Sequence, residues 1–317
     1  MRLRRTSTDD PGFARRRRGR GFSYTDANGR PVRDAEVLAR IDALAIPPAW
    51  RDVWICAAEN GHLQAAGTDA DGRRQYRYHE TWTARAERSK YARVRALAQC
   101  TTGLRRTITA DLRGDDPERR AAAIAARLID VLGVRLGDER YAAERGTIGA
   151  LTLERRHVSV DGDRLLLDFP AKSGVQWLAE LRDPELADAL AHVPRGAATR
   201  LTAWRHDGDE HRLSARSLTA YLAAGSGCPI TPKDLRTLLG SRTAAEVLAR
   251  TGAVARREQD AVIRAAVDAV ADTLRNTRAV ARSSYIDPLV IERYRRGRVA
   301  TLSRASVSDR AYAELVG

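Results

Sequence analysis

The chain has 317 residues and a strong excess of positive charge: 55 Lys and Arg residues stand against 41 Asp and Glu, giving a net charge of +14 and a pI near 10.4. The length favours two domains, each large enough to bury a core. The charge favours a polyanionic partner, which can be DNA, RNA or an anionic membrane surface. No apolar run approaches the roughly 20 residues of a membrane span, and the N-terminus lacks the apolar segment of a secretory signal.

The N-terminal part is predicted to be a basic arm followed by a β-rich domain at residues 21–84. Residues 1–20 contain eight arginines and almost nothing to bury, which predicts a disordered arm that attracts DNA regardless of sequence. Asn28-Gly29 suits a tight turn, and a short helix is expected after it with Asp34 as the N-cap. The runs VWICAA and HLQAAG predict a second hairpin.

Residues 72–82, GRRQYRYHETW, are predicted to form a further strand or extended loop that touches nucleic acid. The rings of Tyr76 and Tyr78 can lie against sugar or base, the arginines can pair with phosphates, and the Gln75 amide can read an adenine. The alternative is an amphipathic edge strand with half-buried tyrosines. A charged helical linker is expected at residues 83–92.

Residues 85–317 are predicted to form a larger, mainly α-helical domain. The segment 117–133 is an amphipathic helix closed by Gly133. HVSVDG, DRLLLDF and GVQWLAEL are strand-like runs that predict a small β-sheet. Further helices are expected at 184–192, 214–224, 232–239, 243–250 and 257–276. The chain as a whole is therefore predicted to be an α+β protein.

Lysine is rare in this chain. Of the 55 basic residues, only Lys90, Lys172 and Lys233 are lysine, and the rest are arginine. Arginine cannot give up a proton near neutral pH, whereas a lysine with a lowered pKa can. Lys172 and Lys233 are therefore candidates for a functional role, and Lys172 is expected in a loop at the tip of the β-sheet. For Lys90, which lies in a polar run, chance survival is the preferred interpretation.

Cysteine and histidine give no sign of a bound metal. Cys56, Cys100 and Cys228 form no CxxC pair, so neither a disulfide framework nor a zinc site is supported. The six histidines are scattered, and there is no HExxH motif or Walker glycine loop. We therefore expect a protein of the cytoplasm that binds nucleic acid without a cofactor.

A metal-free cleavage of a phosphodiester needs a nucleophile, cations for the non-bridging oxygens and an acid for the leaving oxygen. Four ordered segments could supply them: RLGDERYAAERGTIGALTL at 135–153, FPAKSG at 169–174, TPKDLRTLLG at 231–240 and LRNTRAVARSSYIDP at 274–288. Together they resemble the catalytic motifs of type IB DNA topoisomerases, in the small bacterial, poxvirus-like branch. IPPAWRDVWI and GRRQYRYHETW resemble the N-terminal domain of that branch, so the resemblance covers roughly residues 20–295.

The resemblance implies a set of roles, all in this chain's numbering. The implied catalytic residues are the arginines Arg135 and Arg236, the general acid Lys172, the phosphate contact Asn276 and the nucleophile Tyr285. The family forms a 3′-phosphotyrosyl bond, lets the nicked duplex swivel and reseals it without ATP or metal. It thereby relaxes positive and negative supercoils. A monomer that closes as a clamp around duplex DNA in the bacterial nucleoid is implied. The implied DNA contacts are Gln75, Tyr76, Tyr78, Arg140, Tyr141 and Lys233.

Two positions depart from the family, and one spacing carries a geometric prediction. Poxvirus enzymes have histidine where this chain has Asn276, and asparagine can donate a hydrogen bond but cannot shuttle a proton. Asp287 stands where many bacterial relatives have histidine, and the sequence assigns it no role. Nine residues at about 100° each would place Asn276 and Tyr285 on opposite sides of one continuous helix. A helix break is therefore expected within residues 277–284.

Two other functions compete with this interpretation. Tyrosine recombinases share the set of arginine, lysine and tyrosine, but they carry an HxxR element where this chain has Lys233-Asp-Leu-Arg236. A non-catalytic DNA-binding protein would account for the charge but not for where the lysines stand.

Overall fold

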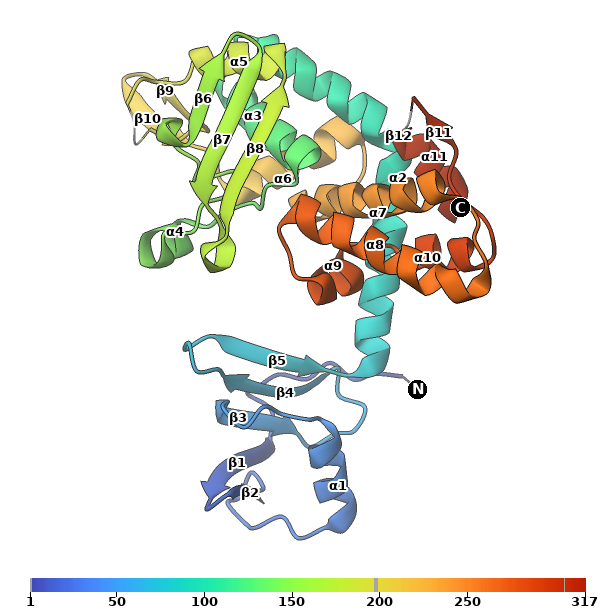
Figure 1. Ribbon diagram of the computed structural model, residues 1–317. Coiled ribbons are helices and arrows are strands. Elements are labelled where there is room, and N and C mark those ends of the chain that lie inside the picture. Colours follow the sequence, from blue (N-terminus) through green and yellow to red (C-terminus); the bar gives the residue numbers. More distant parts are fainter. Residues whose placement is uncertain (1, 197–198, 305) are drawn as a thin grey trace. The chain divides into compact units, whose positions relative to one another are not determined.

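The structure is a computed structural model that describes residues 2–196, 199–304 and 306–317; the side chains of Tyr141 and Ser173 lie outside this description. The chain divides into two compact units, residues 1–89 and 90–317. The fold is α+β, as predicted, with a β-rich N-terminal unit followed by a mainly helical one with small sheets (Figure 1). No helix in the described ranges is long and apolar enough to cross a membrane.

The first unit is built on one antiparallel sheet with the strand order β2-β1-β3-β4-β5. Its small core joins Ile41 to Val53, Ile55 and Ala65. The Asp34 carboxylate caps α1 by accepting hydrogen bonds from two backbone N–H groups, so the predicted N-cap is confirmed. The elements are β1 (Gly12–Arg18), β2 (Gly21–Thr25), α1 (Ala35–Ala43), β3 (Arg51–Cys56), β4 (Leu63–Thr68) and β5 (Arg74–Tyr78).

The prediction of a disordered arm over residues 1–20 is wrong in both halves, because Arg4 forms backbone hydrogen bonds with Asn60 and His62 and the second half contains a strand. Gly12–Arg18 form β1, which pairs with β2 on one side and with β3 on the other. Phe13 packs against the small core, and Arg15 donates hydrogen bonds to the carbonyl oxygens of Ile46, Pro47 and Trp50. A run of arginines can form an inner strand because the ladder uses only backbone groups, while its long side chains reach the solvent.

The second unit is built around one large hydrophobic core, whose residues come from helices, strands and loops between Val94 and Val316. The helix α2 (Glu80–Arg113) begins in the first unit and continues into the second. Three strands form the antiparallel sheet β6-β7-β8, in which Leu165, Leu167 and Phe169 of β7 face the core. The strands and short helices are α4 (Glu139–Arg145), η1 (Arg155–His157), β6 (Val158–Asp161), β7 (Arg164–Pro170), η2 (Lys172–Gly174), β8 (Gln176–Arg182), β9 (Ala203–His206), β10 (Asp209–Arg212), β11 (Leu302–Ser303) and β12 (Ser306–Val307).

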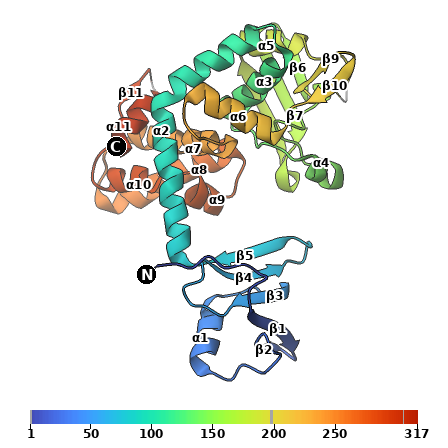
Figure 2. The same cartoon turned by 180° about the vertical axis from the view of Figure 1, so that it is seen from behind.

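The longer helices pack around α7, which contacts α3, α8, α10 and α11 (Figure 2). Two separate helices were predicted at 232–239 and 243–250, but α7 is continuous through Gly240. Glycine weakens a helix by about 1 kcal/mol relative to alanine, and the burial of this segment offsets that cost. The helices are α3 (Pro117–Leu132), α5 (Pro184–Ala191), α6 (Ala215–Ser226), α7 (Pro232–Thr251), α8 (Arg256–Leu274), α9 (Arg278–Ser284), α10 (Pro288–Arg295) and α11 (Asp309–Val316).

Asn276 and Tyr285 do not share one helix, but the break includes Asn276 itself and overlaps the predicted window only at Thr277. The helix α8 ends at Leu274, and Arg275 adopts a left-handed conformation with φ 50°. Thr277 then caps α9, which runs without interruption through most of the segment 277–284 where the break was expected. The turn angle per residue required a break, but it could not say where the chain would place it.

Candidate active site

Four of the five predicted catalytic residues line one cavity of about 560 Å³ in the second unit. Arg135, Lys172, Asn276 and Tyr285 come from three separate segments of the chain, because Asn276 and Tyr285 share the segment 274–288. The fifth, Arg236, lies beneath the phenol, with its Cζ atom 5.1 Å from the centroid of the Tyr285 ring. The structure therefore brings together side chains that span 150 residues of sequence.

Arg135 is held by a close approach of two backbone segments. The helix α3 ends at Gly133, which has the left-handed conformation predicted for a C-cap. The Arg135 carbonyl then accepts a hydrogen bond of 2.8 Å from Ala150 N. A Cβ atom at Gly149 would lie 2.6 Å from the Arg135 oxygen, so this approach requires glycine. The spacing of the RLG and GTIG sequences thus fixes the backbone from which Arg135 projects.

Arg135 also determines how the Asn276 amide is oriented. Its Nη2 donates hydrogen bonds to Asn276 Oδ1 and, at 3.3 Å, to the carbonyl oxygen of Arg275. Guanidinium has only donors, so the amide atom that faces it must be the oxygen. The Asn276 Nδ2 group therefore points elsewhere, and it is buried with no hydrogen-bond partner in the part of the chain that the structure describes. This leaves an N–H donor available for an acceptor that enters the cavity.

Arg236 is almost completely buried on α7, with 3 % of its surface exposed. Its Nη2 donates to the Leu274 carbonyl at 3.3 Å, while Nε and Nη1 are buried and have no hydrogen-bond partner among the described residues. Buried polar atoms are nearly always paired in folded proteins, so two orphaned donors on one side chain need an explanation. A negatively charged ligand beside the Tyr285 ring would provide one.

Electrostatics distinguish these two arginines from those that pair with carboxylates, such as Arg105. Burial lowers the pKa of Arg135 and of Arg236 below the usual value, and the Tyr285 phenol only partly opposes this. Arg135 lowers the pKa of Arg236 further. Neither side chain forms an ion pair with a carboxylate in the described part of the chain. Two desolvated cations placed together without an acid favour the binding of an anion.

Lys172 lies at the tip of the β7–β8 hairpin, as predicted. It begins the short helix η2, its side chain is exposed, and it faces the same cavity as Tyr285. The hairpin is tied to its surroundings on both sides, because Pro170 O accepts from Ile148 N at 2.9 Å and Leu178 O accepts from Arg275 Nη2 at 3.2 Å.

The predicted DNA contacts are not all gathered in one place. Tyr76 and Tyr78 of β5 are about half exposed, with ring centroids 6.1 Å apart. Alternation along the strand places Gln75 on the opposite face, where its amide donates to Asp69 at 2.8 Å. Lys233 is exposed in the first turn of α7.

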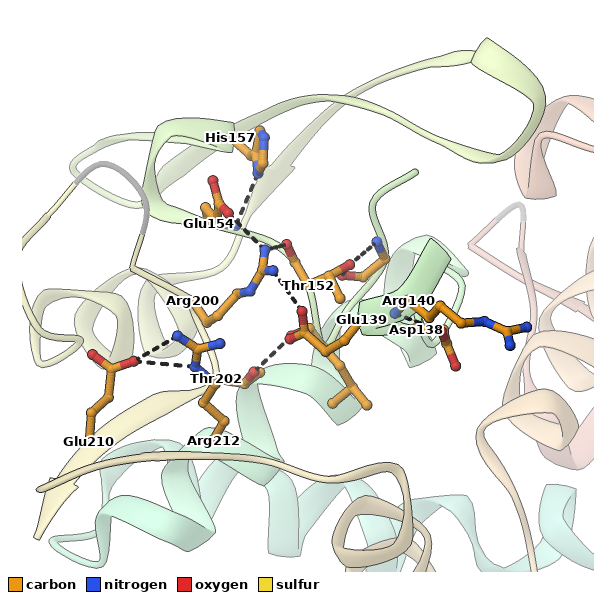
Figure 3. Close-up of polar contacts among 12 residues, drawn as sticks. Asp138, Glu139, Arg140, Thr152, Glu154, His157, Arg200, Thr202, Glu210 and Arg212 are labelled. Atoms are coloured by element: carbon orange, nitrogen blue, oxygen red, sulfur yellow. Dashed lines mark hydrogen bonds and ion pairs between the residues drawn. The ribbon is translucent and has the colours of Figure 1, made fainter. Parts of the chain in front are cut away.

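The other two predicted contacts belong to α4, which a polar network fixes to the neighbouring loop. Arg140 is exposed, and the side chain of Tyr141 lies outside the described residues. Figure 3 shows Arg200 between Glu139 of α4 and Glu154, with a hydrogen bond of 2.8 Å to each. Arg200 also donates to the carbonyl oxygen of Thr152. It therefore connects α4 to the segment that follows Gly149.

The sequence did not indicate the residues of α2 that contact the turn carrying Tyr285. Lys90, attributed to chance, donates from Nζ to the Ser284 carbonyl at 3.2 Å. Arg95, also on α2, pairs with Asp287 at 2.8 Å. The rarity of lysine was the signal for Lys90, and the polar neighbours concealed it. No sequence signal identified Arg95 among so many arginines.

Comparison with known proteins places this chain in a family. Residues 21–69 match the N-terminal domain of bacterial DNA topoisomerase IB, and residues 79–301 match the catalytic core of eukaryotic DNA topoisomerase I. The DNA topoisomerase 1B of Acanthamoeba polyphaga mimivirus is 27 % identical over 295 residues, which cover 89 % of this chain and 87 % of the viral one. DNA topoisomerase 1 of Schizosaccharomyces pombe is 29 % identical over 163 residues, covering 50 % of this chain and 19 % of the yeast protein.

The class defined by the fold and by these matches is a DNA topoisomerase, an isomerase whose substrate is DNA. Within that class, the chain belongs to the type IB DNA topoisomerase family and carries the bacterial form of the N-terminal domain.

Proposed function

We propose that Tyr285 attacks a phosphodiester of duplex DNA and forms a 3′-phosphotyrosyl bond. The Tyr285 oxygen bonds to phosphorus while the bond from phosphorus to the 5′ oxygen breaks, and the phenol proton passes to solvent. Lys172 gives a proton to the departing 5′ oxygen, which is the task of a general acid. The cut strand rotates about the intact one, and the 5′ hydroxyl then attacks the phosphotyrosyl bond to restore the duplex.

The observation that carries this proposal is the buried Arg236 guanidinium, with two unpartnered donors beside the Tyr285 ring. Donors that are already in place for a developing negative charge contribute more to a transition state than flexible ones do. Arg135 and the free Nδ2 of Asn276 supply further donors to the non-bridging oxygens. Asn276 acts only as a donor in this scheme, because an amide cannot transfer a proton at neutral pH.

Neither ATP nor a divalent cation has a part in this scheme. The phosphotyrosyl bond keeps the energy of the diester that was cut, so resealing is nearly isoenergetic with cleavage. The arginines and Lys172 supply the positive charge that a metal ion would otherwise bring. We further propose that the protein acts as a monomer on the nucleoid of a bacterium.

The test is relaxation of plasmid DNA in EDTA without ATP, with positively and negatively supercoiled substrates. Both should relax, and denaturation during the reaction should leave protein on a 3′ DNA end through Tyr285. The Tyr285→Phe variant should bind DNA without forming this adduct. A requirement for Mg²⁺, an adduct on another residue, or reaction only between paired specific sites would contradict the proposal.

A further inference from the structure

The turn that carries Tyr285 is held by an unusually large number of contacts. Tyr285 closes α9 and Asp287 caps α10, so only Ile286 separates the two residues. Because the connection is so short, the orientations of the two helices determine the direction of the Tyr285 side chain. Whatever fixes Asp287 therefore also fixes Tyr285.

The Asp287 carboxylate is completely buried and takes part in four interactions. Arg95 of α2 donates from Nε and Nη2 at 2.8 and 3.0 Å. The Tyr312 hydroxyl of α11 donates at 3.1 Å, and Leu289 N donates at 3.0 Å as the cap of α10. A serine or asparagine at the surface could cap a helix equally well. Burial of a charge with a bidentate arginine and a tyrosine exceeds what capping requires.

The backbone of the same turn is held by α7. Ser241 Oγ donates to the Tyr285 carbonyl at 3.2 Å and accepts from Asp287 N at 2.9 Å. A Cβ atom at Gly240 would lie 2.7 Å from the Tyr285 oxygen, so α7 passes as closely as a backbone allows. Arg236, one turn earlier on α7, lies beneath the Tyr285 ring. The helix that carries the phosphate-binding arginine thus also sets the position of the nucleophile's backbone.

We propose that Asp287 is a positioning residue for Tyr285, acting through its ion pair with Arg95. Figures 1 and 2 show α2 running beside α10, and the pair fastens the turn to α2. With α2 holding one side and α7 the other, the phenol is kept at a fixed place relative to Arg236. This inference rests on Tyr285 being the nucleophile. A misplacement of about 1 Å in a reacting group can slow a reaction on the order of 10²-fold.

The central test is Asp287→Asn, which keeps an oxygen for the helix cap but removes the charge that binds Arg95. We expect the single-turnover cleavage rate to fall about tenfold to a hundredfold, while the affinity for DNA stays the same. Arg95→Met should have the same effect, and the double variant should be no slower than either single one, because both remove one interaction. Arg95→Lys should recover part of the rate.

Asp111 provides a matched control on the same helix, α2. It accepts a bidentate pair of hydrogen bonds from Arg119, at 2.9 and 3.0 Å, and one from the Tyr221 hydroxyl at 2.8 Å. Asp111 thus has the same kinds of side-chain partner as Asp287 away from the cavity, although it is less buried. Asp111→Asn should lower the unfolding temperature and leave the cleavage rate unchanged. If this variant slows cleavage as much as Asp287→Asn does, Asp287 only stabilises the fold.

Two outcomes separate this inference from the proposed function. If Tyr285→Phe abolishes the adduct while Asp287→Asn cleaves at the normal rate, positioning by Asp287 is wrong and the nucleophile stands. If Tyr285→Phe still forms the adduct, the proposed nucleophile itself is wrong. Should Asp287→Asn fail to fold, Arg95→Met removes the same ion pair from its partly exposed side. A normal cleavage rate in that variant would overturn the inference.

Discussion

Two clusters of partly or fully buried arginines in the second unit show opposite chemistry. Around Tyr285, burial lowers the pKa of Arg135 and Arg236, and no carboxylate pairs with either in the described residues. Where α2 meets α3 and α11, burial alone would lower the pKa of Arg105, but two carboxylates raise it above its usual value. Arg105 donates to Asp130 at 2.7 and 3.0 Å and also to Asp309.

We propose from this difference that the paired cluster serves the fold and the unpaired cluster serves the reaction. A paired arginine has its charge satisfied before any ligand arrives, so its effect is on stability. An unpaired one is less favourable in the free protein and gains when an anion binds, which is the arrangement of a site that stabilises developing charge. The two clusters should therefore respond in opposite ways to substitution.

The largest effect on rate is expected from Lys172→Ala. Lys172 is exposed, so its removal leaves no cavity and should not change the unfolding temperature. Loss of a general acid slows a reaction by about 10²- to 10⁴-fold, and we expect a loss of this size in single-turnover cleavage with a much smaller loss in DNA affinity. Equal losses in rate and affinity would show that Lys172 only binds DNA.

Arg236→Met tests the unpaired cluster directly. Removal of one preorganised donor costs about 10²- to 10³-fold in rate, so cleavage should fall by that amount. The unfolding temperature should stay the same or rise, because methionine fills the volume and carries no desolvated charge. Single-turnover cleavage measures the rate, and calorimetry measures the unfolding temperature. A marked loss of stability would mean that Arg236 has a structural role.

Much of the fold was predictable because local rules determined it. The N-cap Asp34, the C-cap Gly133 and the alternating strand around Leu165 and Phe169 follow from neighbouring residues alone. The β1 strand was not predictable by the same rules, because it depends on backbone pairing with strands on both sides.

The residues of the candidate site could be predicted from the sequence, but the residues that hold them in place could not. Motif spacing singled out Tyr285 and its partners, but Lys90 and Arg95 hold the turn from a helix almost 200 residues away in sequence. For the same reason, the sequence did not predict that Cys100 and Cys228 lie close together, with 3.3 Å between their Sγ atoms. Contacts of this kind depend on how the helices pack.

Arg105→Met tests the paired cluster and should give the opposite result to Arg236→Met. It leaves Asp130 and Asp309 buried without their main partner. A third of the Arg105 side chain is exposed, so we expect a loss of about 2–3 kcal/mol in the free energy of unfolding, at or below the low end for a fully buried pair. Single-turnover cleavage should be unchanged. Chemical denaturation measures the stability, and a slower cleavage step would remove the contrast between the clusters.

The smallest effect is expected in the first unit, where β1 presents a third kind of arginine. Arg16, Arg17 and Arg18 are exposed, and no carboxylate pairs with them among the described residues. If they attract DNA at long range, changing all three to glutamine should reduce the slope of log affinity against log salt by about 0.9 for each phosphate that the variant no longer neutralises. The cleavage rate at saturating DNA should not change.

Arg256, Arg257 and Arg264 of α8 are also exposed, and changing them to glutamine removes the same charge. Equal slopes in the two triple variants would mean that only net charge matters, whereas a larger change in the β1 variant would assign the DNA-binding role to β1.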